Sequence, residues 1–429
     1  MNRLQVGVIG ILLLLIAFRF YFFYQNISNY TNGQFLSFET TLLTQPQMAG
    51  NVQKFSVSPN GKDTIFITIP RYPAFHYGDR VRISGYVRVQ TPNVPSTQNG
   101  GLLTNKKIVL TMYFPKIEAV KNNKNYVLAL TSSIRQKITA LFQKTLPANM
   151  ASLLLGIVFG FKETMDKSFM DSLRVSGVLH VIAASGMNVT MLGGFLSSIC
   201  MVFFRRQTSL VLTIIAILFY ATLAGLEPSI IRASIMGILA FGAQILGRQY
   251  LARYAIFLTG YAMLFVTPSL LFDVGFQLSF MSTLGLLSIP PLFMKKERFM
   301  AIVEKSVIGK DVLTTVAAQI ATLPILLSNF GTYSLTSVVV NGLVLWTVPI
   351  LMLIGGIGAI IGLVFEPAGQ IFLYLSLPFL LYFETVVRFF GSFSFGIGFY
   401  AFPFSLAIAY YLFLFAVLLW QEKSSSSQY

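Results

Sequence analysis

The chain of 429 residues is 55% hydrophobic and only 11% charged, and its mean hydropathy is +0.71. A soluble protein of this length needs about 25% charged residues to cover its surface, so the composition excludes an ordinary soluble domain and indicates an integral membrane protein. The 31 Lys and Arg outnumber the 15 Asp and Glu, which gives a formal net charge of +16.

The rarest residues exclude several kinds of chemistry. Cys200 is the only cysteine, so a disulfide framework within the chain is excluded. The two histidines, His76 and His180, have no carboxylate or second histidine at ligand spacing, and we expect neither a metal site nor a cofactor. The nucleotide-binding patterns G-x-x-x-x-G-K-[ST] and G-x-G-x-x-G are missing, so we do not expect the chain to hydrolyse ATP.

Ten apolar stretches are each long enough to cross a hydrocarbon core of about 30 Å. The first follows Arg3 and lacks an A-x-A cleavage pattern, which favours an uncleaved anchor over a secretory signal. The predicted spans are residues 4–24, 178–204, 208–226, 229–247, 252–268, 270–292, 311–330, 335–364, 368–391 and 398–420. We therefore predict a mainly α-helical, polytopic protein of about ten transmembrane helices.

Positive charges fall on alternate loops between these spans. The loops around Pro228, Ser269, Tyr333 and Phe393 carry no Lys or Arg. The opposite set carries Arg205, Arg206, Arg248, Arg253, Lys295, Lys296, Arg298, Lys305, Lys310 and Lys423. By the positive-inside rule the charged loops are cytoplasmic, which places both termini inside and the long polar segment after the first span outside the cell membrane.

The polar segment 35–149 contains 14 Lys and Arg against four Asp and Glu. Long loops translocate regardless of charge, so this composition agrees with an outer position. A basic domain outside attracts polyanions, and the candidates are nucleic acid, anionic lipid headgroups and acidic cell-wall polymers. The alternative is that these basic residues serve only solubility or headgroup contact.

Alternating hydrophobicity predicts a small β-domain, with short strands at 51–58, 64–69, 80–89 and 108–113. Residues 78–87 combine a turn, an alternating strand and Gly85 at the point where a barrel strand bends, which looks like an OB-type barrel. Arg80, Arg82 and Arg88 share one parity, so they are expected on one face with Tyr86 as a stacking surface. Many β-domains have a charged solvent face of this kind, so the pattern alone favours that ordinary interpretation, and nucleic-acid contact is the alternative.

An amphipathic helix is predicted after the β-domain. Apolar residues recur along one helical face from Val127 through Ile138 to Leu141. Such a helix lies in the membrane interface or, as the ordinary alternative, packs against the β-domain.

The stretch 153–194 is too interrupted for one continuous span. Asp171, Arg174 and His180 enter an apolar run that is broken at 176–177 and at 185–186. Polar side chains at membrane depth usually face a water-filled cavity or a partner, and small residues permit broken helices that line such a cavity. We predict the wall of a conduit here, and a tight helix interface is the alternative.

One part of this stretch resembles the ComEC competence family, whose most distinctive helix reads roughly S-G-x-x-H-x-x-A-x-S-G-x-H-V. The chain reads Ser176-Gly177-Val178-Leu179-His180-Val181-Ile182-Ala183-Ala184-Ser185-Gly186-Met187-Asn188-Val189. Three further blocks agree in order, at 220–233, 268–280 and 322–341. The resemblance covers about residues 35–365 and includes that family's OB-like outer domain.

The resemblance implies a channel that passes one strand of transforming DNA across the cytoplasmic membrane during natural competence. Single-stranded DNA needs a cationic, partly aromatic entrance and a polar passage. On this interpretation the DNA-binding residues are Arg80, Arg82, Tyr86 and Arg88, and the channel-lining residues are Arg174, His180, Ser185, Asn188 and Gln277. Expected partners are a cytoplasmic ATP-driven motor or single-stranded-DNA-binding protein and a periplasmic or surface DNA receptor.

Two features depart from the family pattern. Asn188 stands where the family commonly has a second histidine, which weakens the case for a proton-dependent role there, although Asn still forms hydrogen bonds. Many members continue into a metallo-β-lactamase-like domain thought to degrade the other strand, whereas a Ser-rich polar tail follows Lys423. We therefore expect a short form, in which a separate nuclease performs any strand degradation.

For other polar residues in the apolar region, both a structural role and a functional role are considered. Asp273 and Gln277, one helical turn apart, share a face with the passage or bind a neighbouring helix. The predicted ion pairs are Arg232 with Glu227 and Glu384 with Arg388, and Asn341 is a hydrogen-bonding anchor or a pore residue.

The predicted organisation is an N-terminal transmembrane anchor (1–34), an OB-like extracytoplasmic β-domain (35–119), an amphipathic interfacial helix (120–149), a polytopic channel domain (150–421) and a polar cytoplasmic tail (422–429). We expect no catalytic residue. Two rivals remain: a secondary transporter of an anionic solute coupled through Asp171, His180 or Asp273, and an intramembrane enzyme on lipid or cell-wall precursors that uses His180 and Ser185.

Overall fold

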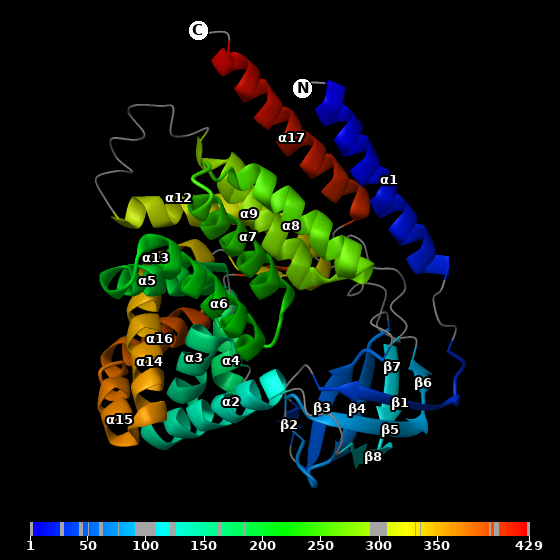
Figure 1. Cartoon of the computed structure of the whole chain (residues 1–429), viewed down its shortest axis with the longest axis vertical. Helices are drawn as coiled ribbons and strands as arrows, with labels where there is room; N and C mark the ends of the chain where they lie inside the picture. The colour runs from blue at the N-terminus through cyan, green and yellow to red at the C-terminus, as the bar shows by residue number, and fades with distance from the viewer. Residues whose placement is uncertain are drawn as a thin grey trace. The chain divides into compact units, whose positions relative to one another are not determined.

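The computed structural model describes residues 3–25, 30–42, 46–49, 51–59, 63–75, 77–90, 109–120, 126–161, 165–182, 186–291, 307–330, 332–334, 336–393, 396–398 and 403–426. These residues form two compact units (Figure 1). The first contains α1 (Arg3–Gln25), strands β1 to β8 and residues 257–273, and the second contains most of the other helices. Within the first unit, Arg19 Nε of α1 donates to the carbonyl oxygen of Phe265 at 3.0 Å.

The strands of the first unit form two sheets. The three-stranded sheet has the order β1 (Phe35–Thr41), β5 (Arg80–Tyr86), β8 (Lys116–Ala119). The five-stranded sheet has the order β2 (Gln47–Ala49), β3 (Val52–Val57), β4 (Ile65–Pro70), β7 (Val109–Tyr113), β6 (Arg88–Gln90), in which only β4 and β7 are parallel. A small β-domain is therefore confirmed, while closure into an OB-type barrel stays a prediction.

Alternation along the strands builds the core of this β-domain. In β5, Val81 and Ile83 are buried while Arg80 and Arg82 point outward, because successive side chains of a strand face opposite sides. Residues from both sheets join them in one apolar cluster, which includes Leu42, Phe55, Ile65, Ile67, Leu110 and Met112.

The strand predicted over 80–89 is two strands that lie in different sheets. Val87 between them is fully buried, its N–H donates to Gln34 O, and its carbonyl accepts from Gly33 N–H. A Cβ on Gly85 would lie 2.8 Å from Pro115 Cβ, so glycine permits the close approach at the bend. Arg88 thus leaves the sheet that holds Arg80 and Arg82.

The helices that follow are α2 (Tyr126–Thr145), α3 (Ala148–Phe159), α4 (Lys167–Val175), η1 (Leu179–Val181), α5 (Gly186–Phe203), α6 (Arg206–Ala224), α7 (Pro228–Ile245), α8 (Ala252–Val266), η2 (Pro268–Phe272), α9 (Val274–Ser288), α12 (Val307–Phe330), α13 (Ser337–Val344), α14 (Thr347–Val364), α15 (Glu366–Tyr374), α16 (Leu377–Gly391) and α17 (Phe404–Ser426). The short strands β9 (Thr332–Ser334) and β10 (Gly396–Gly398) pair antiparallel.

Helix α3 lies in the core of the helical unit, although no span was predicted there. Every residue from Met150 to Phe159 is buried, and the helix ends where Gly160 adopts a left-handed φ of 70°. The C-terminal part of α2 joins the same core through Ile138, Leu141 and Phe142. That part of α2 therefore packs against helices, whereas Val127 near its start is exposed.

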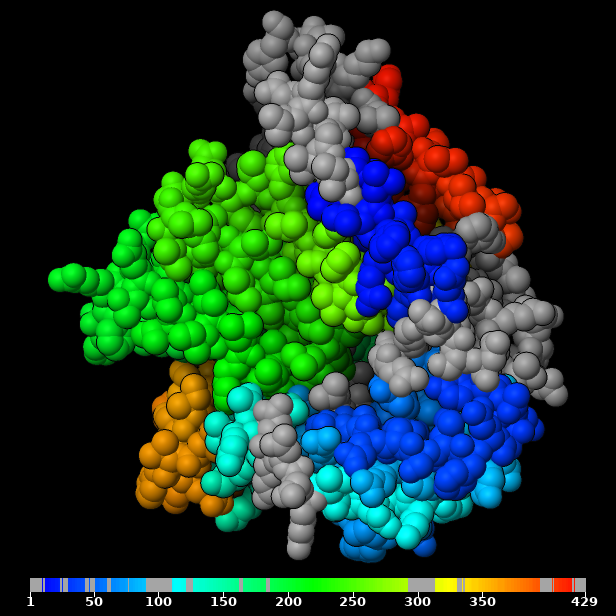
Figure 2. Space-filling model, turned by 45° about the vertical axis from the view of Figure 1, so that its right-hand side comes forward, coloured from blue at the N-terminus to red at the C-terminus, as the bar shows by residue number. Residues whose placement is uncertain are grey.

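Four helices are long and apolar enough to cross a membrane among the described residues: α5, α6, α7 and α14. A fifth span exists if α15 and α16, which meet at 45°, count as one. Exposed apolar side chains such as Val202, Phe203, Ile215 and Leu218 lie on α5 and α6, which belong to the green part of Figure 2. A mainly helical protein with membrane-spanning helices agrees with the prediction, and the number ten stays a prediction.

At least three predicted spans are broken, and one of them, 368–391, consists of α15 and α16. The span 335–364 separates into α13 and α14, because Pro349 lacks the N–H that a continuous helix would bond to Leu345 O. The span 178–204 consists of η1 followed by α5. The interruption predicted for 153–194 is therefore present.

Candidate nucleic-acid interface

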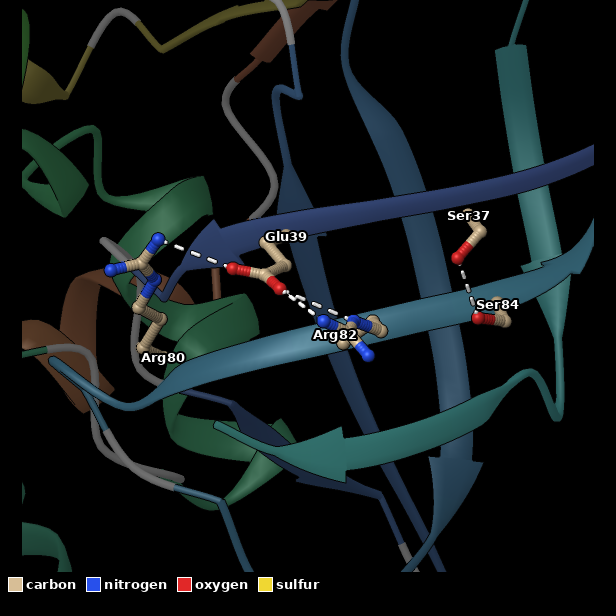
Figure 3. A network of polar contacts seen from close by, with 5 residues as sticks. All are labelled: Ser37, Glu39, Arg80, Arg82 and Ser84. Carbon is tan, nitrogen blue, oxygen red and sulfur yellow. Dashed lines mark hydrogen bonds and ion pairs between the residues drawn. The ribbon is translucent and has the colours of Figure 1, made fainter. Parts of the chain in front are cut away.

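Arg80 and Arg82 share one carboxylate on the outward face of the three-stranded sheet (Figure 3). The antiparallel register places Glu39 of β1 directly opposite Arg82 of β5. Arg82 Nη2 lies 2.6 Å from Glu39 Oε1, and Arg80 Nη2 lies 3.2 Å from Glu39 Oε2. Beside them the hydroxyl groups of Ser37 and Ser84 are 2.9 Å apart.

This network reduces the positive charge that the sheet presents. The hydrogen bond from Arg82, followed by the attraction of both guanidinium groups, lowers the pKa of the Glu39 carboxyl below its usual 4.5. Glu39 is therefore ionised at neutral pH and offsets one of the two arginine charges. Two of the four predicted DNA-binding residues are thus engaged within the β-domain.

The other two, Tyr86 and Arg88, line an open pocket of about 320 Å³. Four aromatic rings surround it, and their exposed fractions lie between 48% and 66%. The full lining consists of Phe35, Ser84, Gly85, Tyr86, Arg88, Tyr113, Phe114, Pro115 and Lys116. Exposed rings grouped around a hollow offer stacking surfaces for a flat ligand.

Ring contacts hold this aromatic pocket in shape. Phe35 and Tyr86 meet edge to face with centroids 5.3 Å apart, and the guanidinium of Arg88 lies 5.7 Å from the Tyr113 ring centroid. Lys116 is paired with Glu118 at 2.8 Å, which raises the pKa of its ammonium group. Arg88 belongs to none of the ion pairs among the described residues, so its charge remains available to a phosphate.

The structure brings together a site that the sequence pattern identified only in part. Tyr86 and Arg88 were predicted, whereas Phe35, Tyr113 and Phe114 were missed. Phe35 faces Tyr86 across the β1–β5 ladder, and Tyr113 ends the strand that pairs with β6. The aromatic residues at the strand ends are visible in the sequence, but which of them lie side by side depends on the register of strand pairing.

The residues predicted to line a channel occupy several environments. Arg174 is exposed and lies 3.5 Å from Asp171, one turn away on α4. His180 on η1 is exposed, and Gln277 on α9 is half-buried. Ser185 lies outside the described residues.

Asn188 is almost fully buried and anchors helices. Its Nδ2 donates to Ile157 O at 2.7 Å, and the hydroxyl of Tyr220 on α6 donates to the adjacent Val158 O at 2.9 Å. Both acceptors belong to the last turn of α3, where carbonyl groups lack intrahelical partners. In this conformation Asn188 serves helix packing.

The remaining polar predictions have mixed outcomes. Glu384 and Arg388 form the predicted pair at 2.8 Å. The predicted pairing of Arg232 with Glu227 is not found among the ion pairs of the described residues, and Arg232 donates to Ser279 O of α9 instead. Asn341 bonds within α13 to Ser337 Oγ at 3.4 Å, and the same hydroxyl accepts from Gln319 Nε2 of α12 at 2.7 Å.

Close helix contacts surround the interrupted segment. A Cβ on Gly156 would lie 2.4 Å from Ile182 Cγ2, and a Cβ on Gly177 would lie 2.5 Å from Ser337 Cβ. Ser334 Oγ also donates to Val175 O at 2.6 Å. The helices are closely packed at these contacts.

The apolar helices fit a membrane protein, and the small β-domain presents a pocket lined by aromatic and basic residues. The sequence profile described as "Competence protein" matches residues 157–424, and the chain belongs to that family. The resemblance to ComEC-type proteins is thereby confirmed.

Relatives support the same family. The chain is 26% identical over 210 residues to ComE operon protein 3 of Bacillus subtilis, covering 49% of the chain and 26% of the relative. It is 29% identical over 178 residues to Recombination protein 2 of Haemophilus influenzae, which covers 39% of the chain and 23% of that relative. An uncharacterized protein of Aquifex aeolicus is 26% identical over 230 residues, which covers 53% of the chain and 49% of that relative. The chain thus spans less than half of each relative's length, and no solved structure matches significantly.

Proposed function

We propose that this protein passes single-stranded DNA across the cytoplasmic membrane during natural competence. The family supports a role in DNA uptake, and the apolar helices fit a membrane protein. In this proposal the β-domain receives the strand outside the cell, and the helical unit forms its route. The driving force comes from a cytoplasmic motor or single-stranded-DNA-binding protein, and a separate nuclease degrades the other strand.

The aromatic pocket is the observation that carries the proposal. Aromatic side chains bind unpaired bases by stacking, whereas a duplex keeps its bases stacked inside the helix. Arg88 supplies a cation beside these rings for the phosphate backbone. A surface of this composition selects a single strand from a duplex.

The route through the helical unit requires a conformational change. The contacts at Gly156 and Gly177 close the interrupted segment, so strand passage has to separate η1 from α3 and α13. Arg174, His180 and Gln277 then border the strand, together with Asn188 once α5 leaves the end of α3. Polar groups on interrupted helices suit such a passage.

The test uses a naturally competent host whose own copy is deleted and replaced by this chain. Radiolabelled DNA should enter the cytoplasm with the wild-type chain, and entry should fall at least about tenfold with the double substitution Tyr86→Ala and Arg88→Gln, because stacking and phosphate contact are both lost. Lys54→Gln, an exposed charge on β3 that does not line the pocket, is the control and should retain entry. Equal entry in the deletion strain and the complemented strain would contradict the proposal.

A further inference from the structure

Arg232 is a buried cation that the proposed route does not yet use. It lies on the first turns of α7 with an exposed fraction of 7%. Its Nη1 donates to Ser279 O of α9 at 2.8 Å, and its buried Nε has no hydrogen-bond partner. No carboxylate pairs with it among the described residues. Burying an unpaired guanidinium is costly, because water no longer solvates its charge.

The guanidinium lies against the start of α5. A Cβ on Gly186, the first residue of that helix, would lie only 2.9 Å from Arg232 Nη2. Because Gly186 has no side chain, the guanidinium can lie this close to the backbone of α5. A helix N-terminus carries a partial positive charge, so the guanidinium lies close to a second positive group.

An anion satisfies both groups at once. Nε and Nη2 form one edge of the guanidinium, and this edge is the fork that binds two oxygens of a phosphate. One N–H of Nη1 already donates to Ser279 O. Helix N-termini bind phosphate oxygens through their N–H groups, and half-helices in transporters hold anionic substrates in the same way.

We propose that Arg232 and the first turn of α5 form a site for one phosphodiester of the DNA backbone inside the helical unit. The identity of the ligand as DNA rests on the proposed function, while the anion site rests on the geometry of Arg232 alone. The site holds successive phosphates of a strand and gives the route an affinity for the backbone that does not depend on base sequence. Phosphate-only recognition suits a passage that accepts any sequence.

The first test measures anion binding by the full chain in a non-ionic, phosphate-free detergent. The thermal midpoint of the wild type should rise with added inorganic phosphate, compared with chloride at equal ionic strength, because a ligand that binds only the folded state stabilises it. Arg232→Met should lose this response and, without phosphate, should unfold no earlier than the wild type, because it removes an unpaired buried charge. Arg248→Met, an exposed arginine beyond the end of α7, is the control and should respond like the wild type.

A second pair of variants keeps the test decisive if Arg232→Met does not fold. Arg232→Lys retains the charge without the fork, and Arg232→Gln removes the charge. The apparent affinity for phosphate should fall at least about tenfold in Gln and less in Lys, since a bidentate, charge-assisted contact is lost stepwise. An unchanged phosphate response in both variants would overturn the anion site.

Probe chemistry then identifies the source of the phosphate. A thymidine dinucleotide should stabilise the wild type, and its uncharged methylphosphonate analogue should not. Stabilisation by phosphatidylglycerol alone would overturn the assignment to DNA. If the chain binds phosphate but is not needed for DNA entry, the proposed function is contradicted while the anion site is supported. If DNA entry is normal with an Arg232→Gln chain, the route does not use the site.

Discussion

Glu39 determines how much positive charge the three-stranded sheet offers to a polyanion. It sits between Arg80 and Arg82 and accepts from both. The alternation of residues along β5 predicted that both arginines lie on one face. The carboxylate comes from the neighbouring strand β1, and only the pairing register of the two strands places it opposite Arg82. Charge counting along one strand therefore overstates the attraction of this face.

Glu39→Gln should strengthen the binding of single-stranded DNA by the full chain. Both guanidinium groups become free for phosphate, so affinity at low salt should rise several-fold and the log–log salt dependence should steepen by about 0.7 per added phosphate contact. Fluorescence anisotropy with a labelled oligothymidylate over a salt series measures both quantities. Glu366→Gln, which frees Lys144 on the helical unit, is the control for a lost carboxylate. A weaker or unchanged affinity would show that this face does not meet DNA.

The same carboxylate predicts a pH dependence. The pKa of Glu39 is lower in the folded chain than its usual 4.5, so its ion pairs contribute stability above about pH 4.5 and lose it as the pH falls through the folded value. Protonation releases Arg80 and Arg82, and DNA phosphates stay anionic there. Binding by the wild type should therefore increase on acidification more than binding by Glu39→Gln, measured by anisotropy in matched buffers. Identical pH profiles would contradict the assigned role of Glu39.

At the scale of elements, apolar length predicted where helices lie better than where they stop. The break before Pro349 and the bend before Pro378 were both missed, although proline removes the N–H bond to the residue four positions earlier. Proline alone does not predict a break, because Pro324 lies inside the continuous helix α12. Helix α3 was harder to predict, since its 12 residues are too few for a span and its burial comes from neighbours far away in sequence. The aromatic pocket was partly hidden for the same reason, because Phe35 and Tyr113 belong to strands distant from Tyr86.

Close packing of α9 against α12 depends on one glycine. A Cβ on Gly285 would lie 2.5 Å from Ala321 Cβ and 2.8 Å from the backbone oxygen of Ala317. Gly285→Ala should therefore destabilise the chain by about 1–3 kcal/mol through overpacking. Gly242→Ala is the matched control, because nothing lies within 4 Å of its Cβ position and alanine favours a helix. Thermal unfolding in detergent should show a lower midpoint only for Gly285→Ala, and equal midpoints would refute the contact.

At the scale of the whole molecule, the proposed import requires that the β-domain lies on the outer side of the membrane. The basic segment 35–149 and the short loops predicted to be cytoplasmic both carry positive charge, so charge alone does not distinguish the outer side from the inner side. Loop length separates them, since the positive-inside rule applies to short loops and long domains translocate regardless. The predicted orientation, with both termini cytoplasmic, follows from the short loops.

The single cysteine makes this orientation directly measurable. In a Cys200→Ser background, Lys54→Cys places a thiol on the exposed face of β3, and Gln249→Cys places one in the short loop after α7. A membrane-impermeant maleimide should label Lys54→Cys in intact cells and Gln249→Cys only after permeabilisation, because the reagent reaches outer thiols alone. Labelling of both after permeabilisation is the control for reactivity. The reverse pattern would place the β-domain in the cytoplasm, where its aromatic pocket would meet DNA only after transport, and import would then need a different entrance.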